Sequence, residues 1–216
     1  MVQEFAIAFL AIFIPLFIIV NPSSTLALFS AITSSYSKKE RKQTAKNAVK
    51  YAAILLIIFA FAGSAILEYL GIEIYSLRIA GGILLAFVGL DMTRRGQQFG
   101  ESPPGDEHKA DLALVPLAMP SLSGPGAITV IIVSMKIVPV EFDITWWFVV
   151  ILAIIAILLT MIITYFIFLS STFVIKALGK KGMDAFTRVM GLLTVAIAVQ
   201  FMFLAIEGWL IANGFL

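Results

Sequence analysis

Long apolar runs separated by short polar stretches dominate the chain, and their lengths predict membrane-spanning helices. About 20 apolar residues in a helix cross a bilayer core of ~30 Å. Gly, Pro and charged residues bound six such segments, at residues 3–34, 44–70, 74–93, 111–136, 144–178 and 184–212. The fifth run is too long for one upright span, so we expect its membrane part to end near residues 170–172. The pattern predicts an all-α polytopic membrane protein with six transmembrane helices.

One long polar connection divides these segments into two groups of three. Residues 96–110 combine glycines, prolines and charged side chains, a composition typical of a flexible linker. We therefore expect a first three-helix repeat at residues 1–95, a cytoplasmic linker at 96–110 and a second three-helix repeat at 111–216.

The two halves share short motifs in the same order, which predicts an internal repeat. Pro-Leu precedes a breaker dipeptide in each half, at Asn21-Pro22 and at Gly124-Pro125. Leu-Gly closes the second segment of each half, and Arg-x-x-Gly opens the third. Three spans per repeat is an odd number, so the second copy enters the membrane upside down, as in many transporters. A chance likeness between apolar helices is the alternative.

The cationic residues gather near alternate loops. Of the 15 Lys and Arg residues, all except Arg78 and Lys136 lie near the loops after the first, third and fifth segments. Cytoplasmic loops carry an excess of Lys and Arg. We therefore expect these loops in the cytoplasm, and both termini outside a cell membrane that the chain crosses several times.

The two breaker dipeptides fall inside the first and fourth segments and predict discontinuous spans. Proline favours the first helical position, and Asn is a good N-cap. Asn21-Pro22 is therefore predicted to start a half-helix, and Gly124-Pro125 likewise, with Ser123 available just before it as a cap. An interrupted helix in hydrocarbon leaves backbone groups unpaired unless protein or a polar cavity covers them. Inversion points both half-helix N-termini at mid-membrane, where they are expected to form an anion site.

A small zwitterion suits such a site. Its carboxylate can meet the N–H groups, its ammonium can meet carbonyls and hydroxyls, and the small flanking residues leave little room for a large side chain. The expected substrate-binding residues are Asn21, Pro22, Ser23, Ser24, Thr25, Ser121, Ser123, Gly124, Pro125, Gly126 and Ala127. The plain alternative is that the breaks only kink packed helices.

Four other polar residues are candidates for gating or charge pairing: Arg78, Asp91, Arg188 and Gln200. The two arginines could neutralise a gate carboxylate or reach lipid head groups, and the sequence favours neither. No carboxylate lies at mid-membrane depth in the predicted spans, so an obvious proton relay is missing. A coupling proton on a peripheral acid and a sodium ion on backbone carbonyls both stay open.

Composition narrows the function classes further. Apolar residues make up 61% of the chain and charged residues 13%, there is no Cys, and the single histidine, His108, lies in the polar linker. A disulfide framework and a Cys-based metal site are thereby excluded. The net charge of +2 does not indicate nucleic acid as a partner. We expect no catalytic residues, no metal, no resident cofactor and no enzymatic activity; a homo-oligomer stays possible.

Three stretches carry a resemblance to a known family. They are Asn21-Pro22, the run Pro-Leu-Ala-Met-Pro-Ser-Leu-Ser-Gly-Pro-Gly-Ala-Ile at 116–128, and Leu-Arg-Ile-Ala-Gly-Gly at 77–82 continuing to Leu-Asp-Met at 90–92. Here the chain resembles the MarC family of six-span membrane proteins, which includes archaeal small neutral amino acid transporters. The resemblance implies uptake or exchange of glycine, alanine and similar amino acids. Ser23-Ser24 departs from the family pattern. A channel or exporter of small solutes without amino acid specificity is the alternative.

Overall fold

The computed structural model describes residues 2–33, 35–95, 117–118 and 122–215, and their regular elements are all helices. The helices are α1 (Val2–Val20), α2 (Pro22–Ile32), α3 (Lys38–Tyr69), α4 (Ile74–Arg95), α5 (Pro125–Glu141), α6 (Trp146–Leu169) and α7 (Ser171–Ala212). Five stretches of the described chain are long and apolar enough to cross a membrane: Gln3–Val20, Lys38–Tyr69, Ile74–Arg94, Trp146–Leu169 and Lys181–Ala212. The predicted linker at 96–110 lies outside the described residues.

The start of α3 differs from the predicted segment for a local reason. Helix α3 begins at Lys38 rather than at residue 44, because Ser37 and Glu40 form a capping box. The Ser37 hydroxyl accepts from the Glu40 amide at 3.3 Å, and the Glu40 carboxylate accepts from the Ser37 amide at 2.8 Å. Such reciprocal capping satisfies two backbone donors that would otherwise be unpaired. The polar first turns of α3 therefore extend the helix beyond its apolar run.

The fifth predicted segment is divided into two helices. Helix α6 ends at Leu169 and α7 begins at Ser171, so residues 171–178 belong to α7. Gly179, with φ 63° and ψ 176°, then kinks α7. Gly71, just after α3, also has a positive φ, of 65°. Both Leu-Gly motifs thus place a glycine where a left-handed backbone ends or bends a helix.

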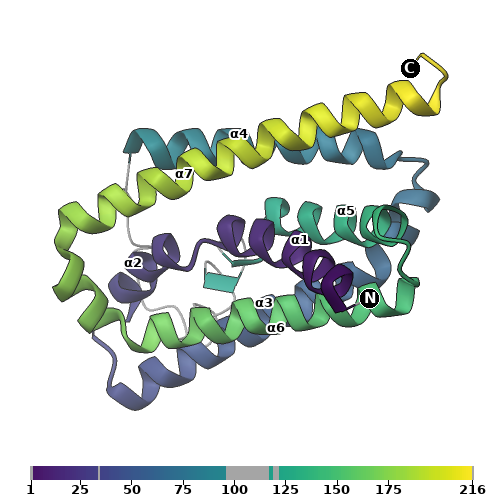
Figure 1. Cartoon of the computed structure of the whole chain (residues 1–216). Helices are drawn as coiled ribbons and strands as arrows, with labels where there is room; N and C mark the ends of the chain where they lie inside the picture. Colours follow the sequence, from purple (N-terminus) through teal and green to yellow (C-terminus); the bar gives the residue numbers. More distant parts are fainter. Residues whose placement is uncertain (1, 34, 96–116, 119–121, 216) are drawn as a thin grey trace.

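The helices pack as two antiparallel pairs with the shorter helices between them (Figure 1). Helix α3 lies along α6, and α4 lies along α7. Helix α5 contacts α3 and α4, whereas α2 contacts α6 and α7. Exchanging α2 with α5, α3 with α6 and α4 with α7 maps these contacts onto one another, although α5 contacts α6 more extensively than α2 contacts α3. Because α3 and α6 run in opposite directions, α2 and α5 also lead to opposite ends of the molecule.

Small residues hold α4 and α7 in close contact. A Cβ atom added at Gly89 would lie 2.7 Å from the Gly191 carbonyl oxygen, and one at Gly82 would lie 2.9 Å from the Ala198 carbonyl oxygen. The partners on each helix are two turns apart, so one glycine-containing face of α4 meets one small-residue face of α7. Such backbone approach is characteristic of helix packing in membranes, where small residues form the interface.

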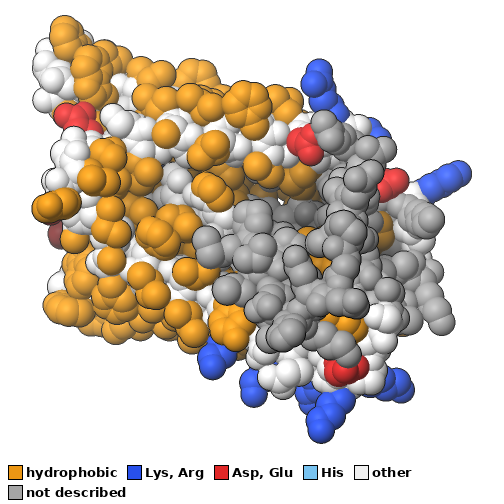
Figure 2. All heavy atoms as spheres, turned by 180° about the vertical axis from the view of Figure 1, so that it is seen from behind, with side chains coloured by type: hydrophobic (Ala, Val, Ile, Leu, Met, Phe, Trp, Pro, Cys, Tyr) orange, Lys and Arg blue, Asp and Glu red, His pale blue; other side chains and the backbone are white. Residues whose placement is uncertain are grey.

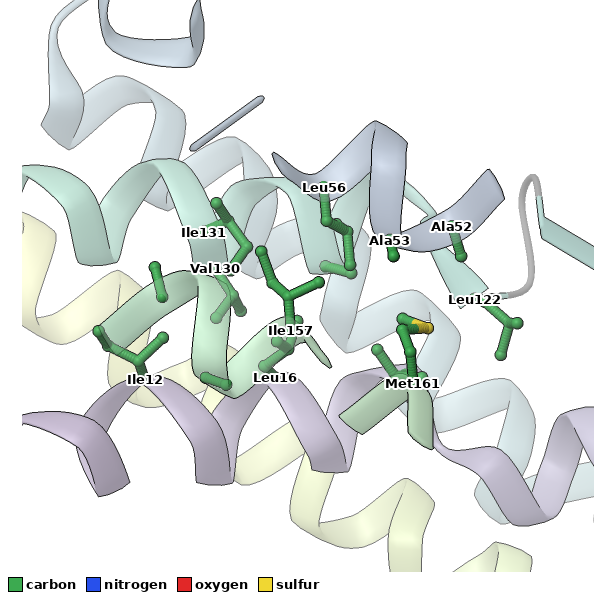
Figure 3. Packing of buried hydrophobic residues seen from close by; sticks show 14 of the residues in the cluster. Ile12, Leu16, Ala52, Ala53, Leu56, Leu122, Val130, Ile131, Ile157 and Met161 are labelled. Carbon is green, nitrogen blue, oxygen red and sulfur yellow. The ribbon is translucent and has the colours of Figure 1, made fainter. Parts of the chain in front are cut away.

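The core lies between α1, α3, α5 and α6 (Figure 3). Its fully buried side chains include Ile12 and Leu16 of α1, Leu56 of α3, Ile131 of α5 and Ile157 of α6. Large apolar side chains also cover the exterior, as expected for a surface that faces lipid. Figure 2 shows them over one part of the surface, with the visible Lys and Arg side chains at the other end and the lower edge.

Candidate functional site

The first helix break centres on Asn21. Helix α1 ends at Val20, Asn21 has a φ of 42°, and α2 begins at Pro22. Asn tolerates this left-handed conformation better than most residues do. The Asn21 carbonyl accepts from the Thr25 amide at 3.4 Å and from the Thr25 hydroxyl at 3.5 Å, which starts the hydrogen bonding of α2. Its side-chain Nδ2 donates to Met92 Sδ on α4, at 3.8 Å.

The second break leaves the N-terminus of α5 without a side-chain cap. Gly124 is extended, with φ −68° and ψ 174°, and Pro125 takes the first helical position. The prediction that Ser123 is available to cap this helix is wrong, because the Ser123 hydroxyl donates to the Ala118 carbonyl at 2.8 Å. No side chain of the described residues caps α5. The amides of Gly126 and Ala127 therefore face outward from a helix start, where the helix dipole is positive.

Both breaks open on one cavity of about 420 Å³. Asn21 and Thr25 line it from the first break, and Gly124, Pro125, Gly126 and Ala127 line it from the second. Segments about 100 residues apart in the chain are thus brought to a single site. Asn21 and Thr25 are buried, each 3% exposed, so their polar groups lie well inside the protein.

The remaining predicted binding residues have different places. Pro22 and Ser123 are buried but do not line the cavity. Ser121 and the side chains of Ser23 and Ser24 lie outside the described residues. Six of the eleven predicted residues therefore share one cavity: Asn21, Thr25 and Gly124–Ala127.

Helix α4 supplies a wall of the cavity that the breaks did not indicate. Leu84, Leu85, Phe87, Val88 and Met92 line it. These residues belong to a regular apolar helix, and nothing in their local pattern marks them as lining a site. The sequence feature that best indicated this wall was the family-like stretch at residues 77–92, which ends at Met92.

Gly126 packs against two neighbouring helices at the edge of this cavity. A Cβ atom at Gly126 would lie 2.4 Å from Leu85 Cδ2 and 3.2 Å from Ile19 Cγ2. Real Cβ atoms do not approach other atoms as closely as 2.4 Å. The small size of residue 126 thus lets α5 start in close contact with both α1 and α4.

The four gating or charge-pair candidates separate into two groups. Arg78 and Gln200 line a second cavity, away from the breaks. Arg188 is exposed, and its Nη1 donates to the Thr93 carbonyl of α4 at 3.2 Å. Asp91 lies exposed on the same part of α4. Within the part of the chain that the structure describes, no group of three His, Cys, Asp or Glu residues is placed to hold a metal ion.

Comparison with known proteins identifies the family. The family model described as "MarC family integral membrane protein" matches residues 6–210. A UPF0056 membrane protein of Methanocaldococcus jannaschii is 42% identical over 213 residues, which cover 97% of this chain and 98% of the relative. The UPF0056 inner membrane protein MarC of Citrobacter koseri is 35% identical over 189 residues, covering 84% and 86% of the two chains. The MarC protein of Salmonella typhi is equally similar. No solved structure matches the chain.

The family match runs from within α1 to within α7, and the apolar exterior of the structure agrees with it. The chain is therefore a multi-pass integral membrane protein and belongs to the MarC family.

Proposed function

We propose that this protein is a secondary transporter of small neutral amino acids of the glycine and alanine class, working by alternating access. One observation carries the proposal: both helix breaks, from opposite halves of the chain, line the same cavity. Interrupted helices at corresponding places in two halves are typical of transporter binding sites, where irregular backbone lines a cavity rather than lipid.

The chemistry of the cavity favours a small zwitterion. The uncapped N-terminus of α5 offers Gly126 and Ala127 amides to a carboxylate. The side-chain amide oxygen of Asn21 and the Thr25 hydroxyl lie at the other break and can accept from an ammonium group. Leu and Val side chains of α4 form an apolar wall suited to a short aliphatic side chain. About 420 Å³ is near the lower end of the volumes usual for ligand pockets, which favours a small solute.

The helix contacts support an inverted repeat as the basis of alternation. Exchange of α2, α3 and α4 with α5, α6 and α7 preserves the pairing of α3 with α6 and of α4 with α7 and the packing of α2 and α5 against these pairs, and α2 and α5 lead to opposite ends. In this proposal the first and fourth spans are discontinuous, at α1–α2 and at α5 with the residues before it. The helix pairs rock around the cavity, which opens to each side in turn. The distribution of Lys and Arg favours termini outside the cell.

Transport into liposomes tests the proposal. We expect saturable counterflow of labelled alanine, with glycine competing. Asn21→Gly keeps a residue that tolerates a positive φ but removes the amide. We expect it to lower uptake at least about tenfold, the effect of losing roughly 1.4 kcal/mol of binding. Asn47→Ala is the matched control, because the Asn47 side chain accepts from Gln43 on the same helix, α3, at 3.0 Å, and does not line the cavity.

Two results would contradict the proposal in different ways. Normal counterflow by Asn21→Gly would show that the substrate does not bind in this cavity. Non-saturable flux or single-channel currents, without counterflow, would instead favour a channel or exporter of small solutes. We propose that transport is coupled to a proton or a sodium ion. Uptake of labelled alanine driven by an imposed gradient of one of these ions would identify which.

A further inference from the structure

A second cavity, of about 230 Å³, lies beside the C-terminal part of α5, whereas the first cavity lies at its N-terminus. It is walled by α1, α4, α5 and α7, and most of its lining is apolar. Four polar side chains also line it: Arg78 of α4, Ser134 and Glu141 of α5, and Gln200 of α7. The cavity thus places a cation, an anion and two neutral hydrogen-bonding groups in one small space.

Arg78 is the unusual member of this set. The residue is only 7% exposed, and its Nε has no hydrogen-bond partner among the described residues. Its guanidinium carbon lies 5.7 Å from the centroid of the Phe201 ring, a cation–π contact. The Glu141 carboxylate attracts the Arg78 guanidinium electrostatically. No described carboxylate, however, forms an ion pair with Arg78 within 4.0 Å. Its burial also argues against contact with lipid head groups.

A buried guanidinium with a free donor is costly unless an anion pairs with it. A cation–π contact offsets only part of that cost. The planar guanidinium donates two parallel hydrogen bonds to a carboxylate, which gives both strength and orientation. The side chain therefore lies ready for a carboxylate that enters the cavity from outside the protein.

The two cavities follow one another along the same three helices. On α1, Pro15 lines the second cavity and Val20 lines the first. On α4 the second cavity has Arg78 and the first has residues 84–92, and on α5 the order is reversed. Between them α4 and α5 are in tight contact: a Cβ at Gly81 would lie 2.2 Å from Thr129 Cγ2. The structure thus holds two cavities along the same helices, with the contact of Gly81 and Thr129 between them.

We propose that the Arg78 cavity is a second binding site for the carboxylate of a small zwitterionic solute. Arg78 binds the carboxylate, Glu141 accepts from the ammonium group, and Ser134 and Gln200 add hydrogen bonds. The solute then reaches the first cavity when the contact at Gly81 and Thr129 opens. Only the role of this site on a transport path rests on the proposed function; binding at Arg78 does not.

Binding can be measured directly because the chain has no cysteine. Ser134→Cys places a single thiol in the cavity, and its maleimide labelling in detergent reports occupancy. We expect glycine at ten times its Kd to slow labelling about tenfold by simple mass action. Glycinamide, which lacks the carboxylate, should not protect, and protection by glycine should disappear in Ser134→Cys combined with Arg78→Gln.

Repeating the labelling in the Asn21→Gly variant separates binding at the Arg78 cavity from an effect of binding at the first cavity. Protection should persist when Asn21→Gly is added, because the thiol lies in the Arg78 cavity. Its loss in that background would show that only the first cavity binds, which would overturn the proposal. Equal protection by glycinamide would do the same. Protection by phosphoethanolamine and not by glycine would indicate a lipid head-group site instead.

Transport kinetics give a second measurement. Arg78→Gln should raise the KM for alanine about tenfold, equivalent to one lost charge-assisted interaction, with Vmax within about twofold. Arg78→Lys keeps the positive charge but loses the planar guanidinium that donates two parallel hydrogen bonds. It should therefore bind alanine more weakly than the wild type and more tightly than Arg78→Gln. Lys136→Gln is the matched control: it removes a cation of the neighbouring helix α5 that pairs with Glu68 and does not line the cavity. An unchanged KM in Arg78→Gln, with alanine counterflow intact, would refute the site while leaving the proposed function standing.

Discussion

Gly126→Ala tests whether the start of α5 is held against α4 by the absence of a side chain. The added Cβ would lie 2.4 Å from Leu85 Cδ2 and 3.3 Å from Leu85 Cγ. Leu85 is 2% exposed, so its side chain has little free space into which to rotate. Ile19 Cγ2 lies 3.2 Å from the same Cβ position, which is also a tight contact. The substitution therefore forces either a strained rotamer of Leu85 or a shift of α5.

The expected loss of stability follows from the steric overlap between the new Cβ and Leu85. Overpacking of a filled core costs about 1–3 kcal/mol, so we expect Gly126→Ala to destabilise the protein by that amount. Leu85→Ala removes both Leu85 atoms near the new Cβ and leaves a void, at a cost of about 2–5 kcal/mol. In the double variant the alanine Cβ occupies part of that void. The double variant should therefore be more stable than the two single losses predict, by about 0.5–3 kcal/mol.

Unfolding followed by tryptophan fluorescence in detergent measures the four proteins of this cycle. Alanine counterflow on the same samples shows whether the first cavity is disturbed as well. Strictly additive losses would refute the reasoning, because they would mean that residues 85 and 126 do not compete for the same space.

Three further predictions concern the fold. Gly89→Ala should cost about 1–3 kcal/mol in the same unfolding assay, because its Cβ would meet backbone atoms at Gly191 that cannot rotate away; wild-type stability would contradict the close contact of α4 and α7. Ser37→Ala should destabilise the start of α3 by about 0.5–2 kcal/mol, seen as faster amide exchange in its first turn, and unchanged exchange would show that the capping box contributes nothing. Lys136→Ala should change stability by no more than about 1 kcal/mol, since its ion pair with Glu68 is exposed; a larger loss would mean that this pair is shielded from water.

Much of the fold could be predicted because lipid imposes strong rules on sequence. Every backbone polar group in hydrocarbon needs an internal partner, so apolar runs must be helices. The breaks at Asn21-Pro22 and Gly124-Pro125 were likewise visible, since proline at the first helical position and a preceding non-helical residue are local features. The structure has helix starts at both prolines.

Helix ends were less predictable where polar residues decide them. Ser37 and Glu40 lengthen α3 through two hydrogen bonds that an apolar pattern does not reveal. Ser123 was expected to cap α5, but the Ala118 carbonyl is its partner. A hydroxyl can bond to several backbone groups nearby, and the chain path chooses among them.

Residues far apart in the chain could be assigned to one site only from the packing. The sequence alone determined that the chain is helical and membrane-embedded, and where its helices break, because these depend on composition and on neighbours in the chain. Only the tertiary structure decided that α4 forms a wall of the first cavity, and that Arg78, Glu141 and Gln200 surround another. The reason is physical: which faces of α4, α5 and α7 meet depends on where small residues such as Gly81 and Gly126 let backbones approach, and that is a property of helix pairs.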